Sequence, residues 1–202
     1  MSLLAKVRGS IRLCIIALPW VKYYFETERL TLRPLEEADI DSLVEKINHP
    51  LIADTTLLIP HPYSRGDAED WLVKVKQAHA EGKSLNLMMI LKEPEKLIGG
   101  IALEKINQTH KSAELAYWLG VDFWRNGYTA EAASRRVDYA FEEMNFERIW
   151  AICMMRNPAS ARVMEKIGMK HEGVARREYI KNGVHEDFNH YAILRSDWEE
   201  MR

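Results

Sequence analysis

Residues 117–132 read YWLGVDFWRNGYTAEA and combine a strand, a polar turn and the start of a helix. The first three residues are apolar, Gly127 lies in the turn, and the pattern from Thr129 onward is helical. The first backbone N–H groups of a helix, together with its dipole, form a binding site for phosphate oxygens. Gly127 lets a ligand approach the backbone closely, and Arg125 adds a positive charge. Glycine also occurs in such turns for backbone reasons alone, so this stretch by itself leaves both interpretations open.

Residues 157–169 read NPASARVMEKIGM and form a second junction between a predicted strand and a predicted helix. Asn157 suits the N-cap of that helix, and Ser160 lies one helical turn further on. The alternative is that both side chains face a ligand. Open α/β sheets bind their ligands at the carboxyl ends of adjacent parallel strands. The two junctions together therefore predict one cleft.

Hydrophobic periodicity and turn residues predict the other elements. The predicted strands are 30–33, 85–91, 97–106, 113–121, 148–155, 172–180 and 184–194, and the predicted helices are 36–47, 65–81, 129–144 and 159–167. We expect residues 49–62, which contain three prolines, to form a loop. Short connections between the middle strands indicate antiparallel pairing, and the later strand–helix–strand–helix order indicates a mixed sheet with helices on both faces.

Composition limits the classes of function that remain. The chain has 202 residues, of which 47% are hydrophobic and 29% are charged, as expected for one globular domain. Lys and Arg total 28 and Asp and Glu total 30, and the net charge of −2 argues against a nucleic-acid-binding protein. The two cysteines, Cys14 and Cys153, predict a reduced, cytoplasmic protein.

The N-terminus differs from the rest of the chain. Three basic residues precede the apolar run 13–18, which is typical of a secretory leader or a membrane-surface anchor. That run is too short to span a membrane, and no cleavage pattern follows it. We therefore favour an N-terminal extension at residues 1–25 that docks on a domain at 26–202, with no membrane span.

Residues 124–132 and 157–169 together resemble the GNAT acetyltransferases, and within them the RimJ/RimL-type branch. The sequence ERLTLRPL at 28–35 and AELAYWL at 113–119 resemble the same branch, so the likeness covers about residues 26–195. The resemblance implies an α/β fold with a mixed, mostly antiparallel central sheet, splayed between two parallel strands, with helices on both faces. It also implies acetyl-CoA as co-substrate, bound in the splay, and no metal.

The resemblance further implies which residues hold acetyl-CoA. The backbone of three residues pairs with the pantetheine arm: Tyr117, Trp118 and Leu119. Six residues hold the pyrophosphate: Trp124, Arg125, Asn126, Gly127, Tyr128 and Thr129. Asn157 and Ser160 line the arm near the thiol. The sequence departs from the family at Trp124, where Gln or Arg is frequent, and at Met164, where some members carry a tyrosine acid. Ile152 stands where other members carry a base.

Acetyl transfer to an amine requires removal of a proton and stabilisation of the departing thiolate. We predict direct transfer, with Glu114 as the base through a water molecule and a backbone N–H near Leu119 polarising the carbonyl. Ser160 is the predicted acid or hydrogen-bond donor to the thiolate. The alternative for Glu114 is a solvated carboxylate on a strand. Cys153 lies among apolar residues and is interpreted as an inert core residue.

The acceptor is the least constrained part of the prediction. The resemblance places it against residues 51–64 and 176–190, and its branch suggests the α-amino group of a protein or peptide N-terminus, of the ribosomal-protein type. A small amine, such as a polyamine or an aminoglycoside, and a non-catalytic acyl-CoA-binding module are the alternatives. An open groove would favour the peptide, and an enclosed acidic pocket the small amine. A homodimer is left open, and no nucleic-acid partner is expected.

Overall fold

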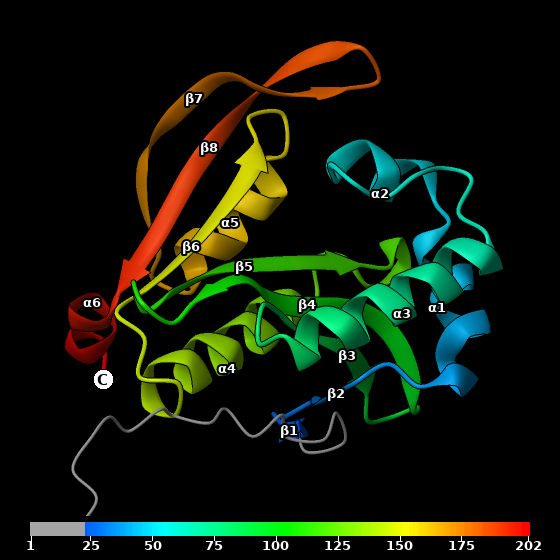
Figure 1. Ribbon diagram of the computed structural model, residues 1–202, viewed down its shortest axis with the longest axis horizontal. Coiled ribbons are helices and arrows are strands. Elements are labelled where there is room, and N and C mark those ends of the chain that lie inside the picture. The colour runs from blue at the N-terminus through cyan, green and yellow to red at the C-terminus, as the bar shows by residue number, and fades with distance from the viewer. Residues whose placement is uncertain (1–22) are drawn as a thin grey trace, which may run out of the picture.

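The computed structural model describes residues 23–202 (Figure 1). Its strands are β1 (Phe25–Glu26), β2 (Leu30–Arg33), β3 (Leu85–Leu91), β4 (Lys96–Asn107), β5 (Ser112–Leu119), β6 (Arg148–Met154), β7 (Lys170–Lys181) and β8 (Val184–Leu194). Its helices are α1 (Ile40–Ile47), α2 (Pro50–Thr55), α3 (Arg65–Ala80), α4 (Tyr128–Glu142), α5 (Pro158–Lys166) and α6 (Arg195–Glu200). The sequence predicted each of these apart from β1, α2 and α6, with small differences at the ends.

The strands of this part of the chain form one eight-stranded sheet in the order β1-β2-β3-β4-β5-β6-β8-β7. All neighbours are antiparallel except β5 and β6, which are parallel. Their pairing covers three residue pairs and ends at Glu114 opposite Trp150. Beyond that pair the two strands diverge, as Figure 1 shows. This confirms the predicted sheet, including its splay between two parallel strands.

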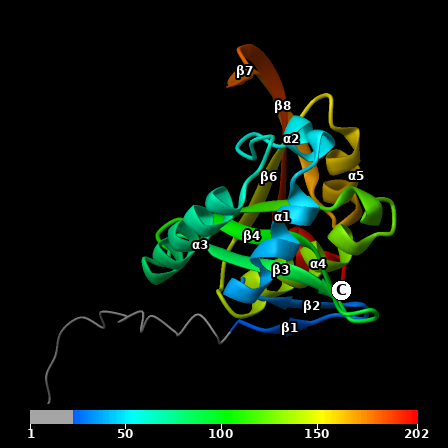
Figure 2. The same cartoon turned by 90° about the vertical axis from the view of Figure 1, so that its right-hand side faces the viewer.

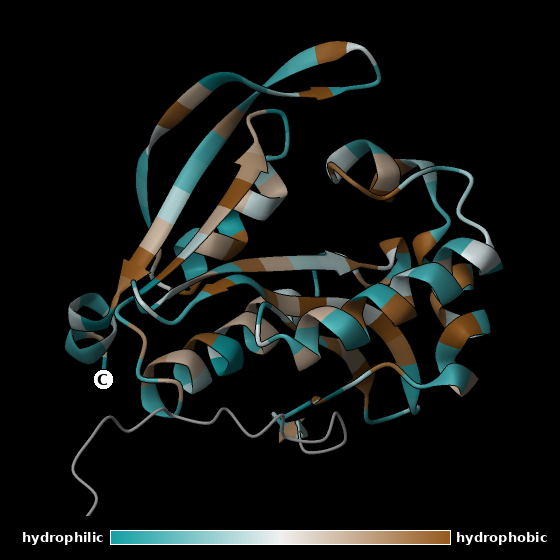
Figure 3. Ribbon diagram, viewed as in Figure 1, coloured by the Kyte–Doolittle hydropathy of each residue, from teal (hydrophilic) through white to brown (hydrophobic). Residues whose placement is uncertain are grey.

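Helices cover both faces of the sheet (Figure 2). One core lies between the sheet and α4, with α5 and α6 at its end, and includes Val137, Phe141 and Ile149. The other core lies under α1 and α3 and includes Leu43, Leu72 and Met88. Figure 3 shows the central strands as largely apolar, whereas polar and apolar residues alternate along α3 and α4. Because strands β3 and β4 are buried on both faces, they carry near-continuous apolar runs.

The expectation of a loop over residues 49–62 is wrong for its first part, which forms α2. Pro50 occupies the first helical position, where its fixed φ is already helical and its missing N–H costs nothing. Nδ1 of His49 accepts the N–H of Leu51 at 3.1 Å and caps the helix. Histidine is an uncommon N-cap, so the starting signal of this helix was missed in the sequence.

The predicted N-terminal extension, residues 1–25, lies outside the described residues for its first 22 positions. Phe25 pairs with Leu32 in the sheet, so the folded domain begins at least one residue before the predicted boundary. Within residues 23–202, no helix combines the length and the apolar character that a membrane crossing requires.

Candidate functional site

The junction between β5 and α4 leaves backbone donors free at the start of a long helix. Gly127 is the N-cap of α4, with φ +80°, and makes no side-chain capping hydrogen bond. The first N–H groups of an α-helix have no partner within the helix. By contrast, Ser64 caps α3, and Asn157 caps α5, through their side chains. The N-terminus of α4 therefore has the open donors that an anion needs.

Positive charge surrounds this open end. A Cβ at Gly127 would lie 3.6 Å from Nη2 of Arg29 and 3.8 Å from Nζ of Lys166, so both cations flank the glycine. Nη1 of Arg29 donates to the carbonyl of Asn126 at 3.0 Å, and its Nε pairs with Glu131 at 2.7 Å. A hollow of about 230 Å³ lies between these groups. Neither Arg29 nor Lys166 was singled out in the sequence, because they lie 98 and 39 residues from Gly127.

The edge of β5 that faces the splay presents unpaired backbone groups. The N–H of Gly120 donates to the carbonyl of Ile98 on β4 at 2.8 Å, and hydrogen-bonded pairs alternate along an antiparallel ladder. The backbone of Trp118 therefore faces Gly100 on β4, whereas the backbones of Tyr117 and Leu119 face β6. Because β6 has already diverged, these groups are available to a ligand that extends the sheet.

The backbone carbonyl of Leu119 already has a partner within the chain. The indole N–H of Trp124 donates to the carbonyl of Leu119 at 2.8 Å. Trp124 therefore ties the turn back to the end of β5. The carbonyl and N–H of Tyr117 and the N–H of Leu119 remain for a ligand.

The junction between β6 and α5 brings two hydroxyl groups to the splay. The carboxamide Oδ1 of Asn157 accepts the N–H of Ser160 at 3.2 Å, which confirms its predicted N-cap position. The Ser160 hydroxyl lies 2.9 Å from the Tyr117 hydroxyl, which also donates to the Ser160 carbonyl at 3.1 Å. Burial raises the pKa of Tyr117, so its phenol stays protonated and able to donate. The hydroxyl of Tyr117 was missed in the sequence, which pointed only to its backbone.

Glu114 lies where the two parallel strands part. It is the last residue of β5 that pairs with β6, and it is 9% exposed. Nζ of Lys105 contacts its carboxylate at 2.8 Å, and Lys105 also lies over the ring of Trp150. Glu104 is its cross-strand partner on β4. Burial raises the pKa of Glu104, and the Glu114 carboxylate beside it acts in the same direction.

A second ionisable pair, His190 and Glu178, lies on the same face of the sheet as Glu114, opposite to α4. Ile152, which cannot accept a proton, is paired across the strands with His190, so both side chains share a face. Nε2 of His190 lies 2.7 Å from the carboxylate of Glu178 on β7. This pair was not predicted, because its two members come from opposite arms of the hairpin and show no sequence motif.

Cys153 and Met164 are core residues on the face that α4 covers. Cys153 is 5% exposed and Met164 is 1% exposed. Burial raises the pKa of the Cys153 thiol, although hydrogen bonds with Asn189 and Ser160 oppose this shift. The thiol is therefore protonated at neutral pH and a poor nucleophile. No group of His, Cys, Asp or Glu side chains in residues 23–202 is arranged to hold a metal ion.

A groove lies between the tip of the β7–β8 hairpin and the α2 arm, by which we mean α2 with residues 56–61. Its volume is about 580 Å³, and apolar side chains, including Leu57, Ile59 and Pro60, line it together with polar groups of Asp54, His61, Lys181 and Asn182. Leu58 and Ile180 on its walls are 88% and 60% exposed, so the groove opens to solvent. Its single carboxylate belongs to Asp54.

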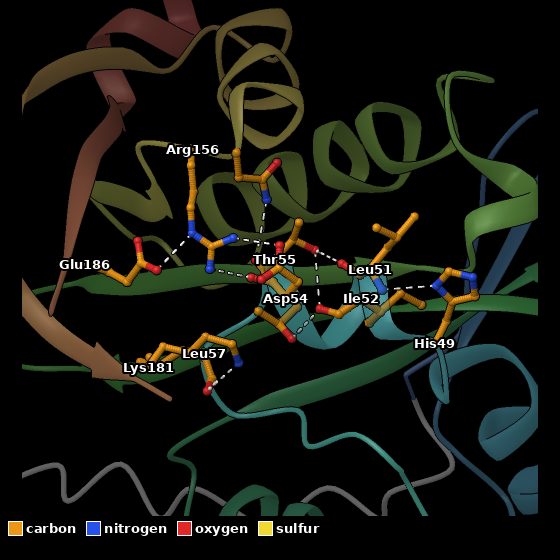
Figure 4. Close-up of polar contacts among 11 residues, drawn as sticks. His49, Leu51, Ile52, Asp54, Thr55, Leu57, Arg156, Lys181 and Glu186 are labelled. Carbon is orange, nitrogen blue, oxygen red and sulfur yellow. Dashed lines mark hydrogen bonds and ion pairs between the residues drawn. The ribbon is translucent and has the colours of Figure 1, made fainter. Parts of the chain in front are cut away.

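The polar groups around this groove are paired with one another (Figure 4). Nη1 of Arg156 contacts the Asp54 carboxylate at 2.7 Å, and its Nε contacts Glu186 on β8 at 2.9 Å. Nζ of Lys181 donates to the carbonyl of Leu57 at 3.4 Å. Asp187, another acidic residue of the hairpin, accepts the N–H of Arg177. The carboxylates near the groove therefore already have partners within the chain.

Comparison with known proteins agrees with this geometry. Residues 29–170 match the family model described as acetyltransferase (GNAT) domain. YdaF of Bacillus subtilis, provisionally named a ribosomal N-acetyltransferase, is 29% identical over 177 residues, which cover 85% of this chain and 94% of YdaF. Spermidine N(1)-acetyltransferase of Vibrio cholerae is 26% identical, with coverage of 84% and 95%. The structure of RimL, a ribosomal L7/L12 α-N-protein acetyltransferase in complex with coenzyme A, has a TM-score of 0.78 at 19% identity, with coverage of 85% and 98%.

Proposed function

From the premise that this chain belongs to the GNAT family of N-acetyltransferases, we propose that its acceptor is the α-amino group of a protein or peptide N-terminus. The observation that carries this proposal is the groove beside the α2 arm. It is open and about 580 Å³ in volume, it is lined by both apolar and polar groups, and its one carboxylate is paired with Arg156. An extended peptide fits such a groove, whereas a polycation would need unpaired carboxylates in an enclosed pocket. The provisional name of YdaF supports the same acceptor class.

Acetyl-CoA lies in the splay between β5 and β6 in this proposal. The pyrophosphate binds the open N-terminus of α4, at residues 124–129, with Arg29 and Lys166 beside it. Tyr117 and Leu119 face the splay, while Trp118 holds them in register on β4. The pantetheine arm pairs with the backbone of Tyr117, which leaves the N–H of Leu119 for the thioester carbonyl. Asn157 and Ser160 then lie along the other wall of the splay.

The transfer step uses groups on both walls. Glu114 takes the proton of the acceptor ammonium through a water molecule, and the amine then attacks the thioester carbonyl. The backbone N–H of Leu119 donates to the carbonyl oxygen as negative charge develops on it. Tyr117 donates to the Ser160 hydroxyl, and Ser160 in turn donates to the departing thiolate. The amine–carbonyl bond forms as the carbon–sulfur bond breaks, the attacking nitrogen loses its surplus proton to the departing thiolate, and no acyl-enzyme is needed.

The test is thiol release from acetyl-CoA with a panel of acceptors, read together with mass spectrometry of the products. The panel pairs peptides with free and blocked N-termini, each with and without an internal lysine, and adds spermidine and an aminoglycoside. Acetylation of free N-termini alone is the expected result. Acetylation of spermidine or the aminoglycoside alone would replace this proposal with the small-amine function that the Vibrio cholerae relative performs. Tight acetyl-CoA binding without turnover of any amine would favour a non-catalytic acyl-CoA-binding module.

A further inference from the structure

Arg156 joins three segments of the chain that are far apart in sequence. It lies between β6 and α5, and its guanidinium contacts the α2 arm twice, at the carboxylate of Asp54 at 2.7 Å and the carbonyl of Asp54 at 2.9 Å. Its Nε contacts Glu186 on the hairpin at 2.9 Å. Figure 4 shows the guanidinium between these two partners. Arg156 therefore connects both walls of the acceptor groove.

The next residue continues this connection toward the splay. The carboxamide of Asn157 has two ends with different partners. Its Nδ2 donates to the carbonyl of Thr55 on α2 at 3.4 Å, and its Oδ1 accepts the N–H of Ser160 at 3.2 Å. The Ser160 hydroxyl in turn lies 2.9 Å from that of Tyr117. A continuous series of hydrogen bonds therefore runs from the acceptor groove to the predicted thiolate donors.

The α2 arm depends on contacts with the rest of the chain. α2 is six residues long, which is too short to be stable as an isolated helix. Ile52 and Ala53 are buried and hold one side of it, while Leu51 and Leu58 are exposed. The position of the arm is therefore sensitive to its polar contacts with Arg156, Asn157 and Lys181.

We propose that Arg156 is a positioning residue that couples occupation of the acceptor groove to the placement of Ser160. This inference rests on the proposed function. A peptide in the groove adds contacts to the α2 arm and to the hairpin, which favours the arrangement in which Arg156 holds both. That arrangement orients Asn157, which fixes the first turn of α5 and with it the Ser160 hydroxyl. The donors for the thiolate are thus fully ordered when an acceptor is present.

Two measurements distinguish this coupling from a simple structural role of Arg156: the melting temperature of the protein and the rate of local opening near Arg156. The side chains of Arg156 and Asp54 are 39% and 57% exposed, and exposed ion pairs contribute little to the free energy of unfolding. Loss of Arg156 should therefore lower the melting temperature only modestly, mainly because Glu186, whose side chain is 16% exposed, loses its partner. Its effect should appear as faster local opening of the segments that it connects.

The test compares Arg156→Ala and Arg156→Lys with Arg148→Ala by hydrogen exchange in the presence of acetyl-CoA. Arg148 is a matched control, because it lies on β6 and forms a forked ion pair with Glu172 on the same hairpin, at 2.6 and 2.5 Å. We expect Arg156→Ala to speed exchange about fivefold at residues 50–57 and in the first turn of α5. Arg156→Lys keeps the charge and loses the forked geometry, so its exchange rates should lie between those of wild type and Arg156→Ala. Arg148→Ala should change the exchange rate of neither segment.

Kinetics with a peptide that the acceptor panel identifies supply the second readout. For Arg156→Ala we expect kcat to fall about tenfold, with the KM for acetyl-CoA within about twofold of wild type. Faster exchange in α2 without a change in α5, or an unchanged kcat, would overturn the coupling. If the wild-type protein acetylates no amine, the proposed function fails, and hydrogen exchange alone then decides whether Arg156 links the α2 arm to α5.

Discussion

Two strand–helix junctions lie at the splay, and the helices that follow them, α4 and α5, are capped differently. After β5, Gly127 starts α4 without a side-chain cap and leaves its N–H groups open between Arg29 and Lys166. After β6, Asn157 caps α5 and also bonds to the α2 arm. The first junction offers backbone donors to a ligand. The second uses its donors within the chain and connects two parts of the site.

We expect this difference to separate binding of the co-substrate, at the first junction, from use of the acceptor, at the second. A phosphate site made of backbone groups tolerates changes in the side chains around it, such as Trp124 in place of Gln or Arg. A junction made of side-chain contacts depends on each residue that takes part. We therefore expect substitutions at the first junction to weaken acetyl-CoA binding, and substitutions at the second to slow the transfer itself.

The largest effect should come from Glu114, which lies between the two junctions at the point where β5 and β6 part. If Glu114 accepts the proton of the amine, Glu114→Gln should lower kcat about 100-fold while leaving acetyl-CoA binding unchanged. Steady-state kinetics with the acceptor found in the panel, together with calorimetry for acetyl-CoA, would measure both.

The matched control for this prediction is Glu104→Gln. Glu104 lies directly across from Glu114 on β4, and burial raises the pKa of Glu104. Removal of its carboxylate should change kcat by less than about threefold, because it lies one strand further from the splay. Equal losses in the two variants would mean that Glu114 acts through local structure and that the base lies elsewhere, with the His190–Glu178 pair as the next candidate.

The second effect sharpens the role of the first junction. Gly127→Ala places a Cβ where a phosphate would approach, and it should weaken acetyl-CoA binding about 30-fold. Gly82→Ala is the control, because Gly82 has a similar φ of +66° and nothing within 4 Å of the added methyl group. Both variants should lose about 1–2 kcal/mol of stability from the left-handed backbone. Calorimetric titration that showed equal affinities would remove the open helix end from the binding site.

The third effect concerns the donors at the second junction. Ser160→Ala should lower kcat about tenfold, because it removes the hydrogen bond to the thiolate, and Tyr117→Phe should lower it by a similar factor, because it removes the donor that orients the Ser160 hydroxyl. Burial raises the pKa of Tyr117, so the phenol remains protonated from pH 6 to pH 9. The loss in Tyr117→Phe should therefore be the same across that range. A loss that disappeared toward high pH would show that the phenol ionises and donates only when protonated.

Short-range sequence signals were enough to predict the first junction, but they did not predict the long-range contacts of the second. A glycine before a helix, an Asn-Pro cap and alternating apolar residues all act within a few positions, and they predicted the strands and the main helices, whereas the splay was implied by the family resemblance. The contacts of Arg156 join residues that are 102 and 30 positions apart, and His190 meets Glu178 only because two strands pair. Such contacts depend on the register of the sheet and on the position of the short helix α2. The sequence analysis did not predict α2.

The three residue pairs that join β5 to β6 are the point about which the two strands can rotate relative to each other. Five residues of β5 extend past them, a length of about 17 Å at the usual rise of a strand. A rotation of about 5° at these pairs moves the far end of β5 by about 1.5 Å, roughly half the length of a hydrogen bond. We therefore expect the fit of the pantetheine arm to depend on the buried side chains at these pairs, among them Ala113 and Ile149.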